Sequence, residues 1–112
     1  MTWAELQEFI KGKRFLIGLT FINKGGEMIE QYQTNGAVKE LTNDGLLRIE
    51  RHDGSIFQLP YDKESIKKAG KGEYRERATG EIITDPDFIV TWEIVTDEAD
   101  NLEEMKKYGY VV

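Results

Sequence analysis

The alternation of apolar and polar positions predicts a chain built mainly of short β-strands. Residues 13–22 carry apolar side chains at every odd position from 15 to 21, and again at positions 16 and 22. Apolar residues on both sides of a strand indicate that both of its faces are covered. Residues 88–95 alternate cleanly, with apolar residues at positions 88, 90, 92 and 94, which predicts a strong final strand.

Two Asp-Gly turns order the middle of the chain. They lie at residues 43–45 and 52–54 and separate stretches with strand-like composition. An Asp-Gly pair between such stretches is a strong signal for a β-hairpin. The turns therefore predict three consecutive antiparallel strands, at residues 37–42, 46–51 and 55–60.

The second turn also predicts a register. A three-residue loop with Gly54 in the left-handed region places Ile49 opposite Phe57 and Leu47 opposite Leu59, so that the apolar side chains share one face. A two-residue loop would separate them. A three-residue loop at 43–45 likewise pairs Leu41 with Leu47 and Glu40 with Arg48.

The other segments predict further short elements. Thr2 and Glu5 form a capping box for a helix at residues 3–11. The Asn-Gly pair at 35–36 interrupts the stretch 27–42, either as a tight turn or as a bulge in one long bent strand. Asp62 is placed to cap a helix at residues 63–69. We also expect strands at 74–79 and 81–84, and a C-terminal helix at 97–107.

Together these elements predict one mainly β domain of the α+β type that spans residues 1–112. We expect a small antiparallel β-meander, either a barrel or a curled sheet of six to seven strands, with short N- and C-terminal helices. Closure of the sheet would remove its exposed edges. The expected core consists of Phe15, Ile17 or Leu16, Leu47, Ile49, Phe57, Leu59, Val90 and Trp92, covered by the N-terminal helix through Leu6 and Ile10.

Composition narrows the possible chemistry. The chain contains no cysteine, which excludes disulfide frameworks, thiolate catalysis and cysteine zinc sites. The N-terminus lacks the pattern of a signal peptide, and the apolar runs are too short to span a bilayer. We therefore expect a soluble cytoplasmic protein with no membrane association.

The charge distribution bears on the choice of partner. The net charge is −6, and residues 80–112 alone carry nine acidic and two basic side chains. Broad nucleic-acid binding requires a basic face, so we expect no nucleic-acid partner. An acidic surface attracts a basic protein.

Candidate chemical groups are scattered along the chain. His52, the single histidine, lies in a turn, where preorganised catalytic sites are rare. The carboxylates of Asp85 and Asp87 match no calcium-loop spacing, and we expect neither a metal nor a cofactor. Arg75 and Arg77 form a basic strip on one strand. The candidate binding residues are Arg75, Arg77, Asp85, Asp87, Asp97 and Asp100.

Three functional classes remain open. Because no catalytic set converges in the sequence, we expect a non-enzymatic interaction module of the inhibitor or immunity type that uses an acidic surface. A small-molecule-binding β-barrel is the first alternative and requires a cavity inside the sheet. The second alternative is an enzyme whose carboxylate lies near an arginine in a cleft and has a shifted pKa.

Overall fold

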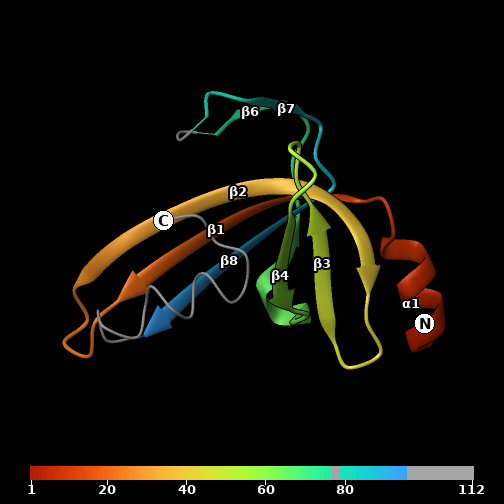
Figure 1. Cartoon of the computed structure of the whole chain (residues 1–112), viewed down its shortest axis with the longest axis horizontal. Coiled ribbons are helices and arrows are strands. Elements are labelled where there is room, and N and C mark those ends of the chain that lie inside the picture. Colours follow the sequence, from red (N-terminus) through yellow and green to blue (C-terminus); the bar gives the residue numbers. More distant parts are fainter. Residues whose placement is uncertain (77–78, 96–112) are drawn as a thin grey trace.

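The computed structural model describes residues 1–76 and 79–95. Six strands form one open sheet in the order β4-β3-β2-β1-β8-β5, and β6 and β7 form a separate two-stranded hairpin (Figure 1). The elements in chain order are α1 (Trp3–Ile10), β1 (Arg14–Ile22), β2 (Met28–Leu41), β3 (Leu46–Glu50), β4 (Ile56–Pro60), the 3₁₀ turn η1 (Lys63–Ser65), β5 (Ile66–Lys68), β6 (Glu73–Arg75), β7 (Ile82–Thr84) and β8 (Phe88–Val95).

The mainly β class is confirmed, whereas the closed barrel and the purely antiparallel meander are wrong. The sheet is open, and β8 runs parallel to β1, with Ile17 opposite Val90. The sequence prediction paired strands in chain order. However, β1 is apolar on both faces, which is typical of a central strand. A central strand has a partner along each edge, and here these are β2 on one edge and the distant β8 on the other.

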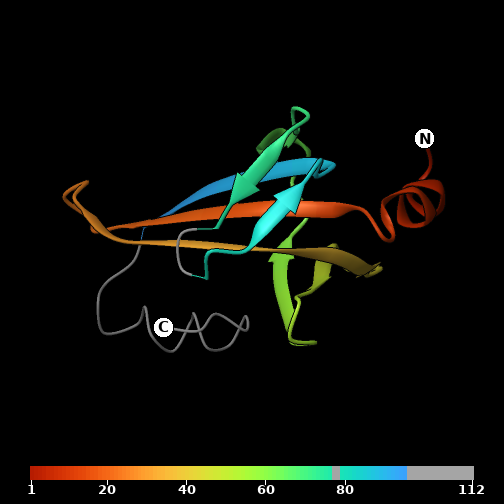
Figure 2. The same cartoon turned by 90° about the horizontal axis from the view of Figure 1, so that it is seen from above.

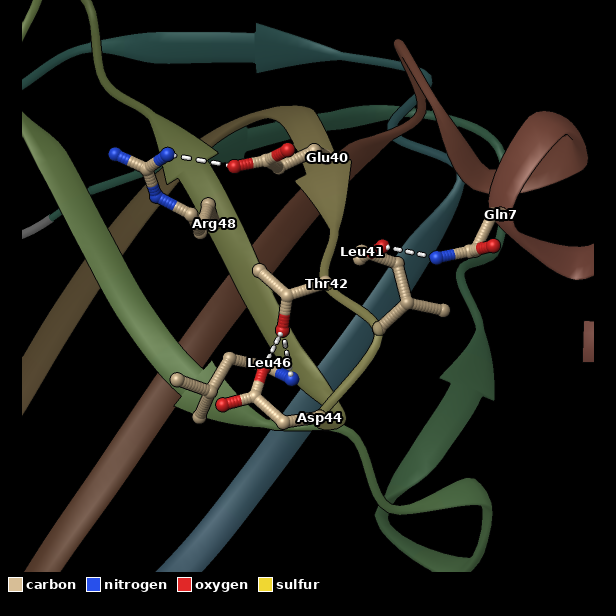
Figure 3. Close-up of polar contacts among 7 residues, drawn as sticks. All are labelled: Gln7, Glu40, Leu41, Thr42, Asp44, Leu46 and Arg48. Carbon is tan, nitrogen blue, oxygen red and sulfur yellow. Dashed lines mark hydrogen bonds and ion pairs between the residues drawn. The ribbon is translucent and has the colours of Figure 1, made fainter. Parts of the chain in front are cut away.

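Both predicted hairpin registers are confirmed. Ile49 lies opposite Phe57 and Leu47 opposite Leu59, and Gly54 has a φ of 85°. The glycine is required there because residues with a Cβ rarely adopt positive φ. Across the other turn, Leu41 pairs with Leu47 and Glu40 with Arg48, whose side chains form an ion pair of 2.6 Å (Figure 3).

Side chains fix the turn between β2 and β3 and attach the N-terminal helix to it. The Thr42 hydroxyl donates to the Asp44 carboxylate and accepts from the backbone N–H of Leu46 at 2.9 Å. From α1, the Gln7 amide donates to the Leu41 carbonyl at 2.8 Å (Figure 3). The predicted capping box of Thr2 and Glu5 is present at the start of this helix.

The Asn-Gly pair at 35–36 lies within one long bent strand, which is the second of the two expected alternatives. The first part of β2 pairs with β1 and the last part with β3, and Ala37 is opposite both Arg14 and Glu50. A Cβ on Gly36 would lie 2.4 Å from the Glu50 carbonyl oxygen. Glycine therefore permits β3 to cross close to β2 and to fold back over one face of the sheet.

This folding back encloses the core. The odd-numbered side of β1 packs against β3 and β4, and α1 contributes Ile10, while Leu6 and Trp92 pack against the core from its margin. The predicted core is confirmed for Phe15, Ile17, Leu47, Ile49, Phe57, Leu59 and Val90, each at most 2% exposed; Trp92 is half-buried.

The predicted helix at 63–69 is wrong. Only the single turn η1 forms, capped by Asp62 as expected, and the chain then continues as β5, which pairs with β8. So short a helix has few internal hydrogen bonds, whereas pairing with an available strand edge satisfies the same backbone groups. The predicted C-terminal helix at 97–107 lies outside the described residues, as do positions 77–78 of the predicted strand 74–79.

Candidate functional site

The β6–β7 hairpin and the β3–β4 strands lie on opposite sides of the β1–β2–β8 part of the sheet (Figures 1 and 2). Where the turns of these two units approach β2, they leave a cleft of about 540 Å³. Residues 32–35 of β2 line one side, and residues 51–53 of the β3–β4 turn line another. The hairpin contributes Glu76, Thr79 and Glu81.

Glu76 is placed by the turn between β6 and β7. Its backbone N–H donates to the Glu81 carbonyl at 2.9 Å, and its carbonyl accepts from Gly80 at 2.8 Å. Gly80 has a φ of 74°, which a glycine adopts without strain. This turn holds Glu76 against β2 at the border of the cleft.

The Glu76 carboxylate contacts neutral donors. The buried Asn35 amide donates to Glu76 Oε2 at 2.6 Å, and the Thr79 hydroxyl lies 3.3 Å from the same oxygen. Burial of the carboxyl raises the pKa of Glu76 above its ordinary value of 4.5, and the neighbouring Glu81 raises it further. The two hydrogen bonds and the more distant Arg51 oppose this shift only in part.

Tyr32 and Arg51 form an aromatic and cationic part of the cleft wall, and both contact the buried Phe57 ring behind them. The Tyr32 and Phe57 rings stack with their centroids 6.1 Å apart. Arg51 lies over the Phe57 ring at 5.1 Å and donates from Nη1 to the Tyr32 hydroxyl at 2.7 Å. These contacts orient the guanidinium along the wall of the cleft.

The turn residues His52 and Asp53 complete the rim. Both are exposed, as expected for a turn. The Asp53 carboxylate accepts from the backbone and hydroxyl of Ser55, and these bonds lower the pKa of Asp53. Asp53 thus stabilises the turn and adds a negative charge at the rim.

The three candidate binding residues within the described part of the chain, Arg75, Asp85 and Asp87, make different contacts. Arg75 is exposed on β6, where it lines a smaller pocket next to the cleft and not the cleft itself. Asp85 Oδ1 accepts from the Gly72 N–H at 2.7 Å, and Asp87 Oδ2 accepts from the Arg14 N–H at 2.8 Å. Asp85 therefore closes the base of the β6–β7 hairpin, and Asp87 connects the loop before β8 to β1. Arg77, Asp97 and Asp100 lie outside the described residues.

Sequence reasoning missed Glu76, Asn35 and Arg51 as a group. Glu76 occurs in a basic stretch, and Asn35 was considered only as part of a turn signal. The three residues come together because β2 bends and two separate hairpins approach it. No local spacing pattern carries that information; the single sequence signal is the Asn-Gly pair at the bend.

The described ranges 1–76 and 79–95 contain no cluster of three or more acidic or histidine side chains suited to hold a metal ion. Within the same residues, no helix is long and apolar enough to cross a membrane. Comparisons with protein families, with curated proteins and with solved structures found no match to this chain.

Proposed function

We propose that this protein is a non-enzymatic interaction module of the inhibitor or immunity type, and that its cleft receives a lysine or arginine side chain of a basic protein partner. The observation that carries the proposal is the half-buried Glu76 carboxyl at the cleft, hydrogen-bonded by Asn35 and Thr79. The acidic balance of residues 80–112, to which Glu81 belongs, supports the same kind of partner.

The charges along the cleft favour a cation. Asp53, Glu76 and Glu81 are acidic, and the basic side chains among the described lining residues are Arg51 and His52, of which Arg51 carries a full charge at neutral pH. The Arg51 guanidinium is already engaged with Tyr32 and Phe57. An incoming ammonium or guanidinium group would offset the negative excess that remains.

Burial adds to this preference. A carboxylate that burial and a like charge destabilise gains more from a cation than an exposed carboxylate does. Neutral donors such as Asn35 orient the Glu76 oxygens without neutralising them. The site is therefore oriented for a cation and electrostatically incomplete without one.

A nuclear magnetic resonance titration tests the proposal. The blocked peptide acetyl-Gly-Lys-Gly-amide should shift the Asn35 side-chain amide signals, because that amide bonds Glu76. The shifts should be lost in Glu76→Gln and retained in Glu8→Gln, which makes the same charge change on α1. Equal shifts with acetyl-Gly-Gln-Gly-amide, or undiminished binding in Glu76→Gln, would refute a cation site at Glu76.

A second candidate, general acid–base catalysis, is favoured by one observation. Glu76, whose pKa is raised, shares the cleft with Arg51 and His52, and shifted carboxyls are common in active sites. The cleft volume also falls within the usual range for small-molecule sites, about 300–1,000 Å³. Turnover of a chromogenic ester, glycoside or phosphate substrate by the wild type but not by Glu76→Gln would support this candidate over the first.

A further inference from the structure

A second pocket, of about 240 Å³, lies beside the cleft, between the β6–β7 hairpin and the β1–β2–β8 part of the sheet. Tyr74 and the buried Ile83 line it from the hairpin. Leu16, Gly18 and Ile89 line it from the even-numbered face of β1 and the adjoining face of β8. A cavity of about 150 Å³ with apolar walls binds benzene, so this pocket has room for one large apolar side chain.

Gly18 leaves room at the β1 wall of the pocket. A Cβ at this position would meet only the Thr91 methyl group, at 3.7 Å, so neither crowding nor a positive φ requires glycine here. A glycine inside a strand weakens it and often marks a place where another group approaches closely. At Gly36 that group is the backbone of β3, whereas at Gly18, among the described residues, the Thr91 methyl group alone lies within 4 Å of the Cβ position.

The pocket and the cleft adjoin. Asn35 and Glu76 line both of them, so their hydrogen bond lies at the boundary. A ligand that places a cation against Glu76 therefore has its neighbouring groups beside the apolar pocket.

We propose that this pocket is a second binding site, which takes a Leu, Ile or Phe side chain of the basic partner, close in sequence to the lysine or arginine in the Glu76 cleft. The inference rests on the proposed function, because the charge of the cleft identifies the partner. The two pockets together select a basic residue with an apolar neighbour. Burial of the apolar side chain supplies affinity, and the carboxylate supplies specificity.

Peptide selection separates this inference from the proposed function. Random dodecapeptides displayed on phage are selected on the wild type, on Gly18→Val and on Glu76→Gln. Gly18→Val places a branched side chain in the pocket. The wild type should select Lys or Arg within two residues of Leu, Ile or Phe. Gly18→Val should still select the basic residue but lose the apolar preference, and Glu76→Gln should lose the basic preference.

A synthetic peptide from the wild-type selection should bind Gly18→Val about tenfold more weakly, because the valine side chain occupies the pocket. A tenfold change in affinity corresponds to about 1.4 kcal/mol. Thr91→Leu, which fills the pocket from β8, gives the same readout if Gly18→Val does not fold. Basic peptides without an apolar preference, or unchanged binding to the filled pocket, would overturn the second site and leave the proposed function standing. A wild-type selection without basic residues, or without any enriched peptide, would overturn both.

Discussion

Two glycines on adjacent strands differ in what surrounds them. A Cβ on Gly36 would lie 2.4 Å from the backbone oxygen of Glu50, whereas a Cβ on Gly18 would meet only a methyl group at 3.7 Å. Gly36 is thus needed for the close crossing of β2 and β3. The contacts around position 18 do not require glycine. The room that Gly18 leaves in the pocket therefore bears on binding.

This difference predicts opposite outcomes for the same substitution. Gly36→Ala should lower the free energy of unfolding by about 1–3 kcal/mol, because two strands must move apart. Gly18→Ala should leave the free energy of unfolding unchanged or raise it by up to about 1 kcal/mol, through the unfolded chain. Urea denaturation of both variants measures the difference, and equal stabilities would contradict a backbone crossing at Gly36.

At the scale of elements, Asp87 connects the loop after β7 to the start of β1. Its carboxylate accepts from the Arg14 N–H, its own N–H donates to the Arg14 carbonyl, and its carbonyl accepts from Ala69. These bonds set the parallel alignment of β8 and β1 at the end where the two strands begin. The sequence analysis considered Asp87 for binding, and these contacts give its carboxylate a structural role.

Removal of this carboxylate should destabilise the sheet. Asp87→Ala removes the carboxylate that accepts from the exposed Arg14 N–H, at a cost of about 0.5–1.5 kcal/mol, the usual net contribution of one hydrogen bond. Glu93→Ala, which removes an exposed carboxylate from β8 itself, should cost less. Thermal unfolding at neutral pH compares the two variants. A smaller loss for Asp87→Ala than for Glu93→Ala would show that the carboxylate does not align the strands.

The sequence predicted correctly the local elements that are determined by residues close together in the chain. The turn with Gly54 at φ 85° and the pairing of Ile49 with Phe57 depend on turn chemistry and alternation within about twelve residues. The helix predicted at 63–69 was wrong because the conformation of this segment depends on the edge of β8, whose paired residues lie 20 to 24 positions later in the chain. Hydrogen bonding to this distant strand stabilises the segment more than its weak helical pattern does.

At the scale of the whole molecule, one long bent strand organises both faces. The bend in β2 lets β3 and β4 cover the core side, and the β6–β7 hairpin lies over the other side of the sheet (Figure 1). The cleft and the adjoining pocket occur where these layers meet β2. The site could not be predicted from the sequence, because β2, the β3–β4 turn and the β6–β7 hairpin each supply only part of it.

The pKa of Glu76, measured from its side-chain carboxyl carbon signal with and without acetyl-Gly-Lys-Gly-amide, tests whether this cleft binds a cation. In the free protein, burial should hold the pKa above 4.5. A bound lysine favours the ionised carboxylate, so the peptide should lower the pKa. A pKa that starts at its ordinary value, or that stays raised when the peptide is present in excess, would contradict a cation site at Glu76.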